Sequence, residues 1–196
     1  MGGRSYSGSM RQHTAHALVL VDLQNAFIRG EAALPSSDRL IQAAQTQLGA
    51  ARAMGSLVVH LQNDGQTGDA DEPGTAGWDL ALNVGPSELV LRKSGDDGFD
   101  GTGLDSLLRE RSVTAISICG LLSEMCVAAT ARTAMRLGYR VLLAHDGHAT
   151  YEVPGYARDE SAVPADLAAR AAEWSLGDDI LIPERSEHIR FVSPGS

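Results

Sequence analysis

Short runs of branched apolar residues recur along the chain and alternate with segments of helical periodicity. Strand-like runs lie at 17–21 (ALVLV), 56–61 (SLVVHL), 88–92, 113–119 (VTAISIC) and 140–144, with a further possible strand at 179–182. Helical patterns lie at 37–54, 102–111, 123–137 and 164–175. Strands that are apolar on both faces are typical of a parallel sheet covered by helices on each side. The sequence therefore predicts a three-layer αβα fold with a mainly parallel, doubly wound sheet of about six strands.

The length of the chain favours one domain. Its 196 residues suit a single α/β domain and are few for two. Residues 1–16 are rich in Gly and Ser and show no periodicity, so we expect a flexible leader there and one folded domain over 17–196. The connection at 62–87 has no periodic pattern, and loops of that length inside a compact domain usually have a functional role.

The net charge and the hydropathy of the chain limit the kinds of molecule that it is expected to bind. Sixteen basic residues against 25 acidic ones give a net charge of −9, the wrong sign for binding nucleic acid or an anionic membrane. No apolar stretch reaches the roughly 18 residues of a membrane span, and no signal-peptide core is present. Cys119 and Cys126 lie in one strand-to-helix stretch, which is poor geometry for a disulfide. We expect a cytoplasmic protein whose partner is a small molecule.

Three residues with reactive side chains follow predicted strands. Asp22 comes directly after 17–21, Lys93 directly after 88–92, and Cys126 a few residues after 113–119, at the start of the next helix. In doubly wound folds, ligands bind at the carboxyl ends of the strands, near the point where the strand order reverses. The side chains meet only if the sheet is wound in this way, because they are far apart in sequence.

Each of the three also has a purely structural interpretation. A Cys near the start of an Ala-rich helix is commonly a small buried apolar residue. An Asp after a strand often caps a loop, and a Lys at the end of a strand is usually solvated. Their joint occurrence at three strand ends favours a shared site.

The sequence motifs around these residues resemble those of a known family. The chain reads VDLQNAF at 21–27, Lys93 followed by FDGTGL at 99–104, and GLLSEMCVAATARTA at 120–134. These three ordered motifs resemble the isochorismatase-like cysteine hydrolase superfamily. Two departures are mild: Ser123 stands where Thr is common, and Ala26 where an acidic residue is common.

The resemblance implies a catalytic triad of Asp22, Lys93 and Cys126. It also implies an oxyanion hole formed by the backbone N–H groups of Leu122 and Cys126, with a cis peptide bond between Leu121 and Leu122. In the implied chemistry the Cys126 thiolate attacks a carbonyl carbon and Asp22 protonates the leaving amine. A helix N-terminus and the Lys93 ammonium are expected to lower the pKa of the thiol toward thiolate at neutral pH.

No metal or other cofactor is expected. The six histidines show no metal-ligand spacing. The nicotinamidase branch of the superfamily has an Asp-x-His metal motif after the second strand, and the corresponding stretch here, 63–69, contains no His. The Gly-rich segments at 95–98 and 101–103 lack the residue spacing of a phosphate-binding loop and have acidic neighbours, so we interpret them as turns.

Several residues near the expected mouth of the site are candidates for substrate binding. They are Gln24, Phe27, Trp78, Phe99 and His148. Packing over the core or against another subunit is an equal alternative for Trp78 and Phe99, as loop packing is for His148.

The function favoured by these observations is hydrolysis of a C–N bond in a small amide or lactam, through a thioester and without metal. Within the superfamily, amidases of the streptothricin hydrolase type fit best, and the acidic surface favours a cationic substrate. The first alternative is an isochorismatase-type vinyl-ether hydrolase, which does not need the cysteine. The second is a non-catalytic binding protein on the same fold. The resemblance also implies a homo-oligomer, either a dimer or a tetramer.

Overall fold

A computed structural model describes residues 13–156 and 161–193. Its strands are β1 (Thr14–Ala15), β2 (Ala17–Val21), β3 (Leu57–Asn63), β4 (Leu89–Lys93), β5 (Ala115–Leu121), β6 (Arg140–Leu142), β7 (His148–Ala149) and β8 (Arg190–Phe191). Its helices are α1 (Asn25–Ile28), α2 (Ser37–Ala53), α3 (Leu104–Glu110), the π-helical turn η1 (Ser123–Val127), α4 (Ala128–Arg136), α5 (Ala165–Trp174) and the 3₁₀ turn η2 (Ser186–His188). None of these helices is long and apolar enough to cross a membrane.

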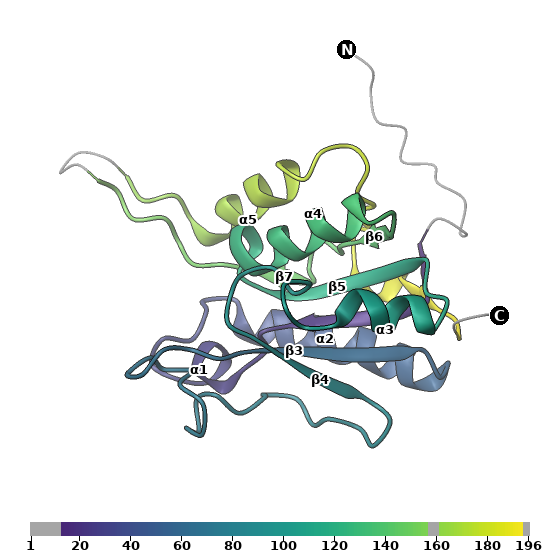
Figure 1. Ribbon diagram of the computed structural model, residues 1–196. Coiled ribbons are helices and arrows are strands. Elements are labelled where there is room, and N and C mark those ends of the chain that lie inside the picture. Colours follow the sequence, from purple (N-terminus) through teal and green to yellow (C-terminus); the bar gives the residue numbers. More distant parts are fainter. Residues whose placement is uncertain (1–12, 157–160, 194–196) are drawn as a thin grey trace, which may run out of the picture.

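The main sheet has the strand order β4-β3-β2-β5-β6, and β7 pairs with β5 beyond the end of β6 (Figure 1). All pairings in this sheet are parallel. The chain moves from β2 outward to β4 and then returns to the other side of β2 with β5. The strand order therefore reverses between β2 and β5, as in a doubly wound sheet, and the expected fold class is confirmed.

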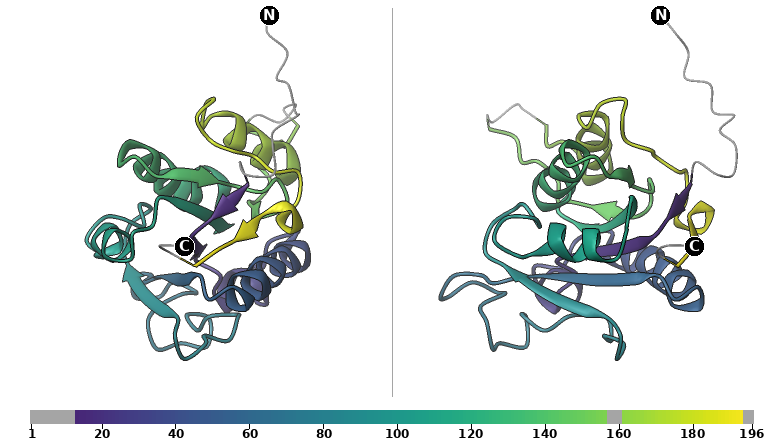
Figure 2. Two further views of the ribbon diagram at one scale, coloured as in Figure 1. Left: turned by 90° about the vertical axis from the view of Figure 1, so that its right-hand side faces the viewer. Right: turned by 45° about the vertical axis from the view of Figure 1, so that its right-hand side comes forward.

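Two apolar layers enclose the sheet because successive side chains of a strand point to opposite faces. Leu18 and Leu20 of β2 pack with the buried face of α2, whereas Val19 and Val21 pack with α3 and α4. The left-hand view of Figure 2 shows α2 on one side of the sheet and α3 with α4 on the other. Both faces of β2 are thus buried, which explains its unbroken apolar sequence.

Two expectations about the chain's outer segments were wrong. Residues 179–182 form one isolated bridge, Leu142 to Leu181, because Pro183 has no N–H with which to extend the pairing. The sixth strand of the sheet is β7 instead. The leader expected at 1–16 is too long, since β1 pairs with β8 and Ala15 is fully buried. The rest of that leader, residues 1–12, lies outside the described residues.

Candidate active site

The ends of three parallel strands bring together the residues that the sequence singled out. Asp22 follows β2 directly, with a left-handed backbone (φ 53°), and its N–H donates a hydrogen bond to Leu61 O. Lys93 is the last residue of β4, two strands away in the sheet. Cys126 lies in η1, directly after β5 on the other side of β2. The site therefore sits where the strand order reverses, where doubly wound folds bind their ligands.

The Lys93 ammonium joins the other two side chains. Its Nζ lies 2.8 Å from Asp22 Oδ2, and both side chains of this ion pair are almost fully buried. The same Nζ donates to Cys126 Sγ at 3.3 Å and to Gly95 O at 3.1 Å. Asn63 Oδ1 lies 3.5 Å from it. One buried cation therefore contacts the carboxylate and the thiol at once, as the strand-end argument predicts.

The protonation state differs from the expectation. Burial and the nearby charge of Asp22 raise the pKa of Cys126 to about 12, although Lys93 acts in the opposite direction. The expected lowering of the thiol pKa was therefore wrong, because the loss of solvent outweighs the single cation. Burial also raises the pKa of Asp22 despite its ion pair with Lys93. Burial disfavours the charge on Lys93, but Asp22 and Cys126 outweigh it and raise the pKa of the ammonium.

The directions of these pKa shifts indicate which of the three groups carries a proton before a substrate binds. The thiol holds its proton, and the neighbouring carboxylate has a pKa shifted toward neutrality, where a group can both accept and return a proton. A carboxylate of this kind can take the thiol proton when the sulfur attacks. The site therefore suits activation of the thiol on demand better than a standing thiolate.

The π-helical turn sets the backbone beside the thiol. It follows a cis peptide bond between Leu121 and Leu122, and its Met125 and Val127 N–H groups both donate to Leu122 O. Among the described residues, the N–H group of Leu122, which lies between β5 and η1, donates no backbone hydrogen bond. Single π-helical turns inside longer helices are frequent at functional sites. The oxyanion hole formed by the N–H groups of Leu122 and Cys126 stays a prediction.

Three polar residues that the sequence argument missed complete the surroundings. Asn63 Nδ2 donates to Asp71 Oδ2 at 2.7 Å, and the charge of the buried Asp71 also raises the pKa of Asp22. Cys126 Sγ donates to Asp96 Oδ1 at 3.6 Å. Asn63 ends β3, so the rule that pointed to Lys93 applies to it equally. Asp71 lies in the middle of the long loop, where no periodic or motif signal marks it.

Gln24 and Trp78 hold the long loop onto the sheet. The Gln24 amide donates to Asn63 O and Trp78 O and accepts from Asn63 N–H. Gln24 is fully buried and its amide is hydrogen-bonded within the protein, and its contact with substrate stays a prediction. Trp78 Nε1 donates to Asp64 Oδ1, and Arg92 stacks on its ring. Its contact with substrate stays a prediction.

The substrate contacts of Phe99, His148 and Phe27 also stay predictions. Phe99 stacks on Tyr139 with ring centroids 6.1 Å apart and packs against the core between the sheet and α3. His148 is buried because it pairs within the sheet as part of β7. Phe27 is half-buried and packs against the opposite core, and nothing tests its contact with substrate.

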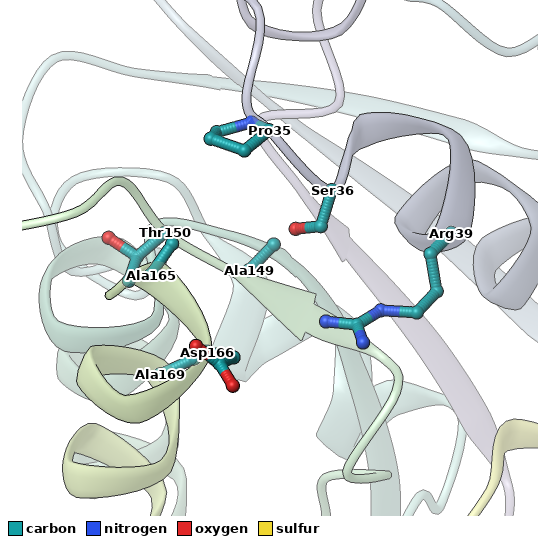
Figure 3. Close-up of a pocket in the computed structure, with 8 residues that line it drawn as sticks. All are labelled: Pro35, Ser36, Arg39, Ala149, Thr150, Ala165, Asp166 and Ala169. Atoms are coloured by element: carbon teal, nitrogen blue, oxygen red, sulfur yellow. The ribbon is translucent and has the colours of Figure 1, made fainter.

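A hollow of about 450 Å³ lies between the start of α2, β7 and the start of α5 (Figure 3). Arg39 and Asp166 come from its two helical walls, and Thr150 lies at one side, next to Ala165. Thr150 Oγ1 donates to Glu124, which is two residues before Cys126 in η1. The hollow therefore adjoins the turn that carries the thiol, although none of Asp22, Lys93 and Cys126 lines it.

We expect the two cysteines to differ in reactivity. Both are free, but Cys119 lies fully buried within β5 and burial raises the pKa of its thiol, whereas Cys126 is partly accessible. Iodoacetamide at mildly alkaline pH should label Cys126 in the folded protein and Cys119 only after denaturation. Peptide mass spectrometry before and after addition of guanidinium measures both. Faster labelling of Cys119 in the folded state contradicts the expectation.

The comparisons with known proteins agree with this geometry. Residues 16–162 match the Isochorismatase domain. The chain is 52% identical over 180 residues to a streptothricin hydrolase of Streptomyces noursei, covering 91% of this chain and 65% of that protein. A second streptothricin hydrolase of that species is 50% identical over 179 residues, covering 90% and 71%. The chain thus spans about two thirds of the length of these relatives.

A crystal structure of an isochorismatase from Pseudomonas putida has the same fold. It superimposes with a TM-score of 0.81 at 24% identity and covers 95% of this chain and 94% of that one. This likeness shows the fold, and the sequence comparisons show that the chain belongs to the isochorismatase family.

Proposed function

We propose that this protein is a cysteine hydrolase that cleaves the C–N bond of a small amide or lactam, with Asp22, Lys93 and Cys126 as its catalytic residues. The observation that carries the proposal is the buried Lys93 ammonium in contact with both the Asp22 carboxylate and the Cys126 thiol. A binding protein on this fold has no need for a buried cation between an acid and a thiol, since such a group costs free energy unless it is fully paired.

The first half of the reaction forms a thioester. Asp22 takes the thiol proton as Cys126 Sγ forms a bond to the carbonyl carbon, and the carbonyl oxygen becomes an oxyanion. The N–H groups of Leu122 and Cys126 stabilise that oxyanion. Asp22 then returns the proton to the nitrogen, the C–N bond breaks and the amine leaves. Lys93 holds the carboxylate in place and offsets the negative charge that moves between oxygen and sulfur.

The second half releases the acid. A water molecule enters the position vacated by the amine, and Asp22 takes one of its protons while the oxygen attacks the thioester carbon. The C–S bond breaks, the sulfur recovers a proton from Asp22, and the carboxylic acid leaves. Each half therefore uses Asp22 once as base and once as acid, which suits a carboxyl whose pKa is raised toward neutrality.

The substrate that we propose follows from the relatives and from charge. Two relatives at 52% and 50% identity are named streptothricin hydrolases, so a lactam or amide of that type is the first candidate. The net charge of −9 favours a substrate that carries positive charge. We also propose that the protein works as a homo-oligomer in a reducing cytoplasm, which fits its two free cysteines.

A screen for amine or ammonia release over neutral and cationic amides and lactams tests this function, with Cys126→Ala as the blank. Release from at least one compound by the parent and none by Cys126→Ala supports it. A parent that releases nothing from amides but opens a vinyl ether, with or without Cys126, points to the isochorismatase type instead.

We expect a chelator to leave the turnover unchanged. Among the residues that the structure describes, no cluster of three or more His, Cys, Asp or Glu side chains is arranged to hold a metal ion. Incubation with EDTA followed by desalting should retain full activity, and elemental analysis should find no stoichiometric metal. Zinc, iron or manganese lost together with activity contradicts this prediction.

A further inference from the structure

A second polar network lies behind the turn that carries Cys126. Ser123 is the first residue of η1 and is only 2% exposed. Its Oγ lies 2.8 Å from Nδ1 of His148, which is 3% exposed and belongs to β7. Neither side chain reaches solvent, so this contact links the sheet to the π-helical turn from inside the protein.

Glu173 of α5 extends the network. Its Oε2 lies 3.5 Å from His148 Nε2 and 2.6 Å from His145 Nδ1. Burial alone raises the pKa of Glu173, but its interactions with His148 and His145 outweigh it and lower the pKa. His148 Nε2 is buried and has no hydrogen-bond partner among the described residues. The Glu173 carboxylate, 3.5 Å away, is the charged group that it faces.

The charge of Glu173 favours a proton on the nitrogen of His148 that faces it. A carboxylate accepts hydrogen bonds only, so it favours the proton on Nε2. With a proton on Nε2 alone, Nδ1 has a lone pair that can accept a hydrogen bond from the Ser123 hydroxyl, 2.8 Å away. The order is thus carboxylate, imidazole, hydroxyl, and the last group belongs to the turn that holds Cys126 three residues later.

The position of Ser123 excludes a second hydrolytic centre. A nucleophilic serine must reach the substrate, and this hydroxyl is buried beneath the turn. A merely space-filling role is also a poor account, because apolar side chains of similar volume fill a core without needing partners. What the network does connect is α5, β7 and η1, three elements that pack on one another beside the reactive thiol.

We propose that Glu173, His148 and Ser123 are positioning residues that hold the π-helical turn in the orientation needed by the Cys126 thiol and by the N–H groups of Leu122 and Cys126. This inference rests on the proposed function, in which these three groups meet the substrate carbonyl. Misplacement of a reacting group by about 1 Å costs about 100-fold in rate. A loosened turn should therefore lower kcat more than substrate affinity.

The experiment compares variants that remove one link with variants that keep it. Ser123→Ala removes the hydroxyl, and Ser123→Thr keeps it. Glu173→Gln keeps the shape but removes the charge that selects the Nε2 proton of His148. The matched control is Ser175→Ala: its Oγ is also hydrogen-bonded, to Ala172 O and Arg132, but it lies at the end of α5 away from the turn.

Two readouts are taken well below the melting temperature of the least stable variant. The first is kcat and KM for the best amide of the screen. The second is the rate at which iodoacetamide labels Cys126, which requires no turnover. We expect Ser123→Ala and Glu173→Gln to lower kcat by about 10- to 100-fold with KM within about twofold, and to change the labelling rate at least threefold. Ser123→Thr and Ser175→Ala should match the parent.

The two readouts keep this inference separate from the proposed function. If the parent cleaves no amide, the proposed function fails and the labelling rate alone decides whether the network positions the thiol. If Ser123→Ala and Glu173→Gln keep the parental kcat and labelling rate, the positioning role is wrong. The positioning role is equally wrong if their kcat falls only in proportion to the folded fraction measured by circular dichroism.

Discussion

Replacement of Cys126 by Ala is expected to lower amide turnover by a factor on the order of 10⁴ or more, because loss of the nucleophile removes the whole covalent pathway. The side chain is partly exposed and small, and its sulfur is held by Lys93 and Asp96, so its loss leaves no large cavity. The fold should therefore survive. Steady-state kinetics against a competent substrate measures the loss, and circular dichroism monitors the fold.

The matched control for this variant is Cys119→Ala. Both changes remove one thiol, but Cys119 lies inside β5 and takes no part in the proposed reaction. It should keep parental kcat while losing some thermal stability, since a buried sulfur leaves a small void. Mass spectrometry during turnover adds a direct test: the parent should accumulate an acyl group on Cys126 when the reaction is stopped with acid. Turnover by Cys126→Ala above about a tenth of the parental rate contradicts covalent catalysis.

The position of the three residues that we propose as catalytic was predictable because it follows from local rules applied to the strands. An apolar run such as 17–21 identifies a buried strand, the residue after it lies at the carboxyl end, and parallel strands share that end. Winding of the sheet around β2 then brings Lys93 toward Asp22. The family motifs and this reasoning agree on the same three residues.

The electrostatics of the site were not predictable in this way. The pKa of Cys126 depends on how much solvent the surrounding loops exclude, and that is a property of the packed structure. The long loop places Asp71 near Asp22 through a hydrogen bond to Asn63, a contact that no motif specifies. A helix N-terminus and one lysine suggest a thiolate, whereas burial favours the neutral thiol.

Short elements were missed for a related reason. The strand β7 has two residues, too few for a periodic signal, and so His148 was expected in a loop. It pairs with Gly120 within the sheet, and its imidazole is buried. The sequence distinguishes an exposed histidine from a buried one only where a longer pattern surrounds it.

Asp22 and Lys93 should show opposite effects on the reactivity of the thiol while both support turnover. The charge of Asp22 and its hydrogen bond raise the pKa of Cys126, and Lys93 lowers it. Asp22→Asn should therefore move the alkylation profile of Cys126 to lower pH, and Lys93→Met should move it to higher pH. Amide turnover should fall by about 10²- to 10⁴-fold in Asp22→Asn, because no group then carries the proton from sulfur to nitrogen.

The pH dependence of turnover gives a second measure of Asp22. Because its pKa is raised, kcat/KM of the parent should decline on the acid side at a pH above the ordinary aspartate value of about 3.9. Asp22 acts here as a base, so kcat/KM falls at low pH because protonation removes the acceptor for the thiol proton. This acid limb should disappear from the residual activity of Asp22→Asn. Glu110→Gln, which removes the same charge from the exposed end of α3, should leave both profiles unchanged.

Stability must be followed in parallel, because removal of one partner leaves the other buried without its counter-charge. Loss of Lys93 or Asp22 alone is expected to cost about 3–5 kcal/mol of unfolding free energy, and the double variant Asp22→Asn, Lys93→Met should recover part of it. Urea unfolding of the four proteins measures this coupling. The direction of each alkylation shift is the decisive result, since interacting groups titrate together. An unmoved profile in Lys93→Met, or full turnover by Asp22→Asn, shows that the three residues do not act as one site.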